Sequence, residues 1–339
     1  RDRSPSRGLG DVYKRQKDMS QLTAKSDIPV LYKQNTTNDL FQLIYVFDMG
    51  NNNDKALGTA FDYLEYLGTS DMTPEELKSE FYRLACTFYV SPGNERTYVV
   101  LSGLNENMPA AVQLFEKLLA DAQVNKEAYT NMTSDILKAR SDAKLNQGQN
   151  FSRLMSFAMY GPKSPATNLL TEAELTNMNP QELVDRIHNQ NSYKHRILYY
   201  GPSSSKDLLA TINQYHQVPA TLKDIPAGNE YAYLETPVTK VLVAPYDAKQ
   251  IYMAQISNLD KKYDPAIEPI RALYDEYFGG GMNSIVFQEM RETRGLAYSA
   301  WASIMPPSYL KYPYVLRTQI ATQNDKMIDA VTTFNDIIN

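Results

Sequence analysis

The chain has 339 residues, of which 43% are hydrophobic and 22% are charged, a composition typical of soluble globular proteins with about two domains. Its formal net charge of -5 argues against a nucleic-acid partner, because nucleic acids are bound by a basic face. Cys86 is the only cysteine, which excludes an intrachain disulfide and a thiolate zinc site. No apolar run reaches the roughly 18 residues of a membrane-spanning helix, so no membrane span is predicted.

The start of the chain differs from the rest in composition. Residues 1–16 are polar, net basic and without periodicity, whereas the remainder is acidic and patterned. They resemble translated adapter sequence, and a genuine disordered tail is the alternative. Residues 1–27 are therefore interpreted as a non-native or disordered leader plus linker.

Two stretches of the chain share one order of predicted elements. In the first, residues 40–50 alternate like a half-buried strand, and residues 58–68 have the pattern of a helix that ends at a glycine. A capping box that starts at Thr73, with proline at the first helical position, opens a second helix. Two strands and a further helix follow, up to residue 120.

The second stretch, residues 250–338, repeats this order. A strand over 250–259 leads to a helix that ends at three glycines, Gly279, Gly280 and Gly281. A second helix, two strands and a last helix follow. This repetition predicts an α+β fold made of tandem units, each with an antiparallel sheet covered by helices on one face.

The first unit continues past its repeat with further helices and a strand, which places the first domain at residues 28–220. The stretch 221–235, which contains proline and glycine, is predicted to be a linker. The second domain is then placed at 236–339. Because it has no counterpart of the continuation in the first domain, we expect it to be truncated.

The three glycines suggest a phosphate-binding loop at first sight. Such loops follow a strand and open a helix, so that backbone N–H groups face the anion. Here a helix precedes Gly279, and no Gly-Lys-Ser/Thr sequence follows Gly281. We therefore expect the glycines to end one helix and start the next, and three in a row indicate close backbone approach or a hinge.

Residues 277–301, YFGGGMNSIVFQEMRETRGLAYSAW, resemble a hallmark segment of the insulinase/pitrilysin family of zinc metallopeptidases. In that family a helix, a glycine run, a second helix and an Arg-Gly-Leu-Ala-Tyr strand start occur in this order. The resemblance extends more weakly over residues 28–339. It implies paired α+β units that form the halves of a clamshell and extended peptides as substrates. It also favours a periplasmic or cell-envelope location, although the compartment cannot be read from the sequence.

The zinc ligands of the family lie in an inverted motif, His-x-x-Glu-His, on a helix. The corresponding residues here are Asp62, Tyr63, Leu64, Glu65 and Tyr66, so only the glutamate is kept. Tyrosine is not a normal zinc ligand, and such sites require imidazole nitrogen. The resemblance therefore implies a degenerate site without a metal.

The histidines offer no replacement for that site. The chain contains only His188, His195 and His216, far downstream and at a spacing that matches no metal signature. Solvated or core-edge positions are the expected environment for them. No cofactor is expected in this chain, and the zinc would belong to a catalytic half located upstream in the same polypeptide or in a partner subunit.

The resemblance therefore implies the C-terminal, non-catalytic half of a zinc metalloendopeptidase, with its catalytic residues elsewhere. A proteolytically inactive structural subunit and a peptide-binding module without an enzyme are the alternatives. In the family, an arginine and a tyrosine seven residues apart bind the substrate backbone and help polarise the scissile carbonyl. Arg291 and Tyr298 have this separation across a predicted helix-to-strand corner at Gly295. The alternative is that Arg291 belongs to a solvated charged run and Tyr298 is a core residue of a strand.

Overall fold

The computed structural model describes residues 19–307 and 309–338 and divides into two compact units. Among these residues, unit 1 contains 19–137 and 168–229, and unit 2 contains 138–167 with the described residues from 230 onward. The interpretation of residues 1–16 as adapter sequence lies outside the described residues. The two units are considered separately below.

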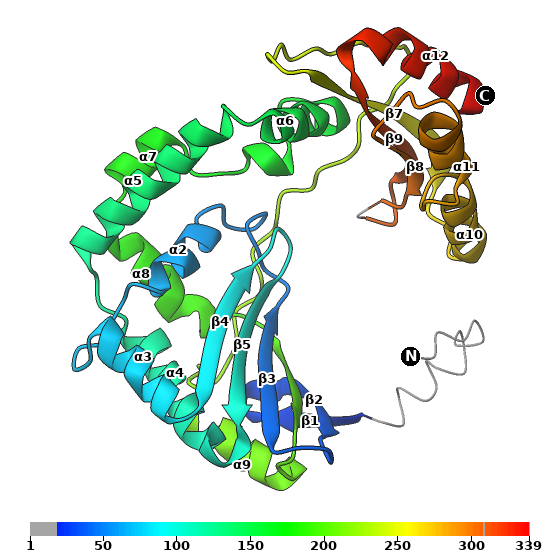
Figure 1. Cartoon of the computed structure of the whole chain (residues 1–339). Helices are drawn as coiled ribbons and strands as arrows, with labels where there is room; N and C mark the ends of the chain where they lie inside the picture. The colour runs from blue at the N-terminus through cyan, green and yellow to red at the C-terminus, as the bar shows by residue number, and fades with distance from the viewer. Residues whose placement is uncertain (1–18, 308, 339) are drawn as a thin grey trace. The chain divides into compact units, whose positions relative to one another are not determined.

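Unit 1 is built on a mixed six-stranded sheet. Its strands are β1 (Ser20–Ala24), β2 (Ile28–Gln34), β3 (Leu40–Phe47), β4 (Cys86–Pro92), β5 (Thr97–Leu104) and β6 (Arg196–Gly201). They lie in the order β1-β2-β6-β3-β5-β4 (Figure 1). β2 and β6 pair in parallel, whereas the other neighbours are antiparallel as predicted. The parallel pair is possible because a long, mostly helical connection returns the chain to the same end of the sheet.

Unit 1 begins earlier than the predicted boundary at residue 28. β1 lies inside the stretch interpreted as leader and linker, and it pairs with β2 from Ser20 opposite Tyr32 to Ala24 opposite Ile28. Ala24 is 5% exposed. The strand is short, polar and at the sheet edge, so its sequence carries little strand signal without the partner that it pairs with.

Helices cover one face of this sheet (Figure 1). Those of unit 1 are α2 (Leu57–Leu64), α3 (Pro74–Arg83), α4 (Met108–Asp121), α7 (Glu172–Asn177), α8 (Gln181–Asn189) and α9 (Ser205–Tyr215). α3 begins at the predicted capping box: the Glu76 N–H donates to Thr73 Oγ1 at 3.2 Å, and the Thr73 N–H donates to Glu76 Oε2 at 2.8 Å. Two bonds therefore fix the start of this helix.

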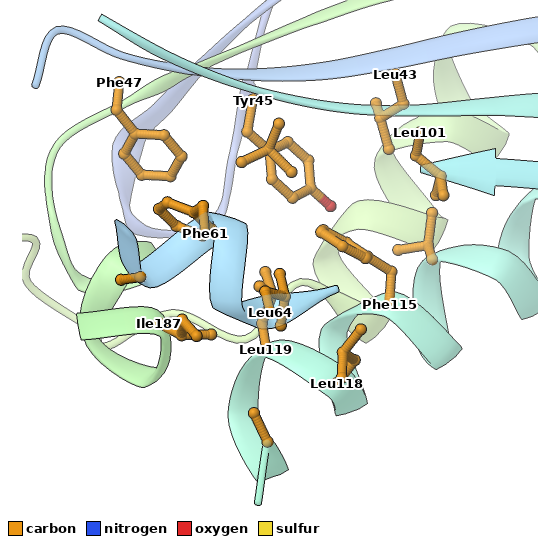
Figure 2. Close-up of a cluster of buried hydrophobic side chains, with 14 of the residues drawn as sticks. Leu43, Tyr45, Phe47, Phe61, Leu64, Leu101, Phe115, Leu118, Leu119 and Ile187 are labelled. Carbon is orange, nitrogen blue, oxygen red and sulfur yellow. The ribbon is translucent and has the colours of Figure 1, made fainter. Parts of the chain in front are cut away.

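The core of unit 1 lies between the sheet and these helices. Figure 2 shows Leu43, Tyr45 and Phe47 of β3 directed at Phe61 of α2 and Phe115 of α4. Each of the five side chains is at most 3% exposed. Burial of a large apolar side chain contributes about 1.5–3 kcal/mol, so this layer holds the sheet and the helices together.

Unit 2 repeats the first part of unit 1. Its elements are β7 (Gln250–Lys262), α10 (Glu268–Phe278), α11 (Ile285–Phe287), β8 (Ser299–Met305), β9 (Pro313–Gln323) and α12 (Met327–Ile338). The antiparallel order β7-β9-β8 matches β3-β5-β4 of unit 1, and the helices fall at the same points along the chain. The predicted α+β fold with a repeated unit is confirmed.

Two parts of the prediction differ from the structure. The second helix of unit 2 has a single α-helical turn, α11, followed by a π-helix over Gln288–Thr293. The predicted extent of the second domain also omits α6 (Gln147–Tyr160), which belongs to unit 2. The Phe151 ring of α6 lies 5.6 Å from the Tyr252 ring of β7, a contact between residues about a hundred positions apart that local patterns do not reveal.

The unit boundary at residue 137 falls inside the long helix α5 (Lys126–Ala143). Residues 221–229, predicted as linker, group with unit 1. The Lys223 N–H donates to the Ser192 carbonyl at 2.8 Å, which ties this stretch to the turn before β6. None of the helices within residues 19–307 and 309–338 is long and apolar enough to cross a membrane.

Candidate functional site

The candidate substrate site of unit 2 is the corner between the π-helix and β8. Ser284 caps the N-terminus of α11, the helical turn that leads into the π-helix, because its Oγ accepts a hydrogen bond from the Phe287 N–H at 3.3 Å. At the other end Gly295 has a φ of 58°, a left-handed conformation that glycine adopts without steric cost. Its N–H donates to the Arg291 carbonyl at 3.1 Å. The chain can therefore leave the helix and enter β8 within a few residues.

Met290 anchors this corner. Its side chain is fully buried in the unit 2 core, and its carbonyl accepts hydrogen bonds from the N–H groups of Leu296 at 2.8 Å and Ala297 at 3.2 Å. Ala297 is itself 6% exposed. The residues next to these two anchors, Arg291 and Tyr298, are thereby held in place while their side chains face outward. π-helical turns occur frequently at functional sites.

The structure brings Arg291 and Tyr298 together. The guanidinium carbon of Arg291 lies 5.6 Å from the centre of the Tyr298 ring and 5.0 Å from the centre of the Phe287 ring, both within cation–π range. Tyr298 is 72% exposed, and its N–H donates to the Ala321 carbonyl of β9 at 2.8 Å. The alternative that placed Tyr298 in a strand core is wrong. The substrate role of the pair stays a prediction.

Charged neighbours leave Arg291 available to a ligand. Its Nε lies 3.5 Å from Glu292 Oε1, and the two side chains are 44% and 52% exposed. An ion pair this long and this exposed contributes little. Arg294 is paired instead with Glu289 at 3.4 Å. Because a guanidinium has five N–H donors, this contact with Glu292 does not saturate Arg291.

The glycine run has a packing role at its first position. A Cβ on Gly279 would lie 2.2 Å from the Ala302 carbonyl oxygen and 2.5 Å from the Ala302 nitrogen, so the backbone of β8 passes directly against it. A Cβ on Gly281 would meet only Glu276 Oε1, at 3.4 Å. The expectation of close backbone approach therefore holds for Gly279, where α10 ends against the sheet.

Replacing Gly279 by alanine is expected to destabilise unit 2 by about 1–3 kcal/mol, because backbone atoms cannot yield to the added methyl group. Gly281→Ala is the matched control and should be close to neutral. Trp301, the only tryptophan, adjoins Ala302 in β8, so urea unfolding followed by its fluorescence reports this unit. Equal midpoints for the two variants would contradict the packing role.

The degenerate metal position lies at the end of α2. Asp62 is in the last turn of that helix, Glu65 caps it, and Tyr66 follows with 47% exposure. Desolvation raises the pKa of Asp62, and the charge of Glu65 raises it further. No imidazole is present in this set, and protons compete with a metal for a carboxylate of raised pKa. These residues do not fit a zinc ion.

The chain was compared with known proteins and solved structures. No family model matches the chain. An uncharacterized zinc protease from Rickettsia felis is 20% identical over 263 residues, which is 74% of this chain and 60% of that protein. The chain therefore spans less than two thirds of the length of this curated relative.

Solved structures show the same fold. The inactive domain of an M16 peptidase from Pseudomonas fluorescens has a TM-score of 0.72 at 16% identity, covering 94% of this chain and 78% of that one. The chain has the fold of an M16 inactive domain. The periplasmic protease PqqL from Escherichia coli has a TM-score of 0.78 at 14% identity, covering 95% of this chain and 36% of that one.

A mutant of the ferredoxin protease FusC in complex with Arabidopsis ferredoxin is a third similar structure, with a TM-score of 0.74 at 11% identity. It is matched over 95% of this chain and 36% of that one. The predicted resemblance to zinc metallopeptidases agrees with the curated zinc protease relative and with the fold of an M16 inactive domain, whereas the assignment as a C-terminal non-catalytic half stays a prediction.

This M16 inactive-domain fold carries a pocket with both polar and apolar lining residues beside the degenerate position. The pocket has a volume of about 270 Å³ and is lined by Tyr66 together with Asn125, Glu127, Ala128, Asn131, Met132 and Asp135. Glu127 and Asp135 lie on α5. Throughout the described part of the chain, no group of three histidine, cysteine, aspartate or glutamate residues is placed to hold a metal ion.

Two of the three histidines depart from their predicted environment, whereas His188 agrees with it. His188 is exposed, and its Nε2 lies 3.1 Å from the Ala122 carbonyl. His195 and His216, in contrast, are only 7% and 0% exposed, and they lie with Glu116 in the core of unit 1. The local sequence contains one weak signal that His216 is buried: it follows the buried residue Ile212 by one helical turn.

Proposed function

We propose that this chain is the non-catalytic half of a zinc metalloendopeptidase and that Arg291 and Tyr298 bind the backbone of its peptide substrate. The catalytic half would lie in the same polypeptide or in a partner subunit. The M16 inactive-domain fold and the curated zinc protease relative support this assignment.

The observation that carries the proposal is the Arg291–Tyr298 pair itself. Two strong hydrogen-bond donors stand next to each other at an outward-facing corner, and buried Met290 and Ala297 fix the backbone beneath them. Donors held in this way lose little conformational entropy when they bind a carbonyl oxygen. A carbonyl-rich extended peptide is the ligand class that suits them.

The chemistry of these residues is electrostatic. The Tyr298 hydroxyl and the Arg291 guanidinium would donate to substrate carbonyl oxygens and hold the peptide in register. Where one of these oxygens belongs to the scissile bond, the donors stabilise the negative charge that develops on it. Zinc, when bound in the catalytic half, would supply an activated water.

Binding of a labelled unfolded peptide, followed by fluorescence anisotropy, tests this function on the chain itself. We expect saturable binding, no cleavage and no effect of a chelator. Arg291→Ala and Tyr298→Phe should each weaken binding by roughly five- to tenfold, the cost of one lost hydrogen bond. Arg294→Ala and Tyr82→Phe, at an exposed position of unit 1, are matched controls.

Two outcomes separate the alternatives. Binding that the Arg291 and Tyr298 variants do not weaken would favour a peptide-binding module that uses another surface. No binding, even with a zinc-bearing catalytic half present, would favour the structural subunit. Chelator-sensitive cleavage by the purified chain would contradict the assignment of a non-catalytic half.

A further inference from the structure

A continuous chain of polar contacts crosses the core of unit 1. Glu116 Oε1 lies 2.6 Å from His216 Nδ1, His216 Nε2 lies 2.9 Å from His195 Nε2, and His195 Nδ1 lies 2.7 Å from the Tyr193 carbonyl oxygen. The Glu116, His216 and His195 residues are 1%, 0% and 7% exposed. We call these three residues the Glu116–His216–His195 chain. The substrate-binding role proposed above makes no use of it.

The three contacts define how many protons the chain must hold. Each contact needs one hydrogen, and the Tyr193 carbonyl can only accept, so His195 donates from Nδ1. Because burial lowers the pKa of His195 to about 4, it is a neutral imidazole near pH 7 and accepts at Nε2. His216 must then donate from Nε2. The remaining hydrogen, between His216 Nδ1 and Glu116, belongs either to His216 beside an ionised carboxylate or to a neutral carboxyl. Both arrangements contain three protons.

Neutral histidines beside an ionised glutamate would contain only two protons. One contact would then place two lone pairs against each other at 2.6–2.9 Å, away from water. An unsatisfied buried polar contact is costly, which favours retention of the third proton.

The surroundings support this proton count. Glu116 Oε2 accepts from Asn191 Nδ2 at 2.9 Å and from the Gln217 N–H at 2.9 Å, so both oxygens of the carboxylate are hydrogen-bonded. Burial lowers the pKa of His195 to about 4, and the neighbouring His216 contributes, in keeping with a His195 that holds one proton only.

Tyr45 of β3 is the remaining titratable group that faces the chain. Its ring centre lies 4.5 Å from that of His216 and 6.1 Å from that of His195. Burial and the charge of Glu116 raise the pKa of Tyr45, so it stays neutral and adds no charge to the network. Figure 2 shows its hydroxyl inside the apolar cluster.

We propose that folding of unit 1 is linked to protons through the Glu116–His216–His195 chain, which holds three protons in the folded state near neutral pH. In the unfolded protein the same residues hold two protons above the ordinary histidine pKa of about 6.5 and four protons below it. The contribution of the chain to stability is therefore greatest near that pH and declines on both sides.

The chain also has a structural consequence. It joins α4 through Glu116, the end of α9 through His216, and the start of β6 through His195, and the Gln217 N–H binds the same carboxylate. Loss of the third proton is thus expected to loosen the segment that leaves α9. Backbone amide exchange at Gln217 would report this locally.

Glu116→Gln separates this linkage from a purely structural role. The new amide oxygen can accept from Asn191 and Gln217, and its NH₂ can donate to His216 Nδ1, so every contact is satisfied by two neutral histidines. Between pH 7.5 and 8.5 the unfolding constant of the wild type should rise about tenfold more per pH unit than that of the variant. Glu95→Gln, at an exposed turn position, should behave as the wild type.

A calorimetric measurement on the unchanged chain covers the case of a variant that does not fold. The unfolding enthalpy is measured at pH 8 in buffers of different ionisation enthalpy, which gives the number of protons released. We expect the Glu116–His216–His195 chain to release about one proton beyond those released by exposed groups. Equal pH slopes for wild type and Glu116→Gln, or no proton released on unfolding at pH 8, would overturn the proposal.

Discussion

Tyr298→Phe and Arg291→Ala are each expected to lower kcat about 100-fold in the peptidase formed with a zinc-bearing half, following the proposed function. Removing one preorganised donor at a developing oxyanion typically costs this much. The free energy of unfolding should barely change, because Tyr298 is 72% exposed and Arg291 is exposed beside it. Steady-state cleavage of a quenched peptide and urea unfolding measure the two quantities.

The neighbouring ion pair of Arg294 and Glu289 supplies the control for this experiment. Arg294→Ala removes the guanidinium that directly precedes Gly295 and is paired with Glu289, and it should leave kcat within about twofold of the parent. A parent-like rate in both the Arg291 and the Tyr298 variant would show that the pair has no part in catalysis. Unfolding of both would show instead that the corner itself depends on them.

Acidification from pH 7 to pH 4 is expected to destabilise unit 1 by about 3 kcal/mol through His195 alone. The pKa of His195 falls from its ordinary 6.5 to about 4 because the side chain is buried and lies beside His216. One unit of pKa corresponds to about 1.4 kcal/mol. The folded state therefore excludes a proton that the unfolded state binds between these two values.

The sign follows from proton binding. Because the folded pKa is lower than the unfolded one, the stability is fully present above about pH 6.5 and is lost as the pH falls toward 4. Urea unfolding at pH 7, 6 and 5 samples this range while most carboxylates stay ionised. His195→Gln should flatten the decline, whereas His188→Gln, at an exposed position, should not. Equal slopes in the wild type and His195→Gln would contradict the assignment.

Local sequence determined the order of elements. Alternation along residues 40–50 and 250–259, with a helical pattern between strands, predicted β3, β7 and the repeat, because the side-chain period follows backbone geometry. The capping box at Thr73 likewise placed the start of α3, since its hydrogen bonds lie within one turn of helix. Both signals are short-range, and the structure confirms both.

Contacts across long separations were not predictable in this way. β1 is recognisable only beside β2, and α6 belongs to unit 2 because Phe151 meets Tyr252. The π-helix also departs from the simple helix predicted there, since its pattern of apolar residues differs little from that of an α-helix over six residues. For β1 and α6 the deciding interaction lies outside the local sequence.

The functional residues divide along the same line. Arg291, Tyr298 and the glycine between them lie within eight residues, so the sequence by itself determined that one helix-to-strand corner would bring the pair together. Glu116, His195 and His216 lie up to a hundred residues apart, and nothing in their spacing predicts contact. Only the packing of α4 and α9 against the sheet decided that they share a buried site, because burial and hydrogen bonding are properties of the assembled core.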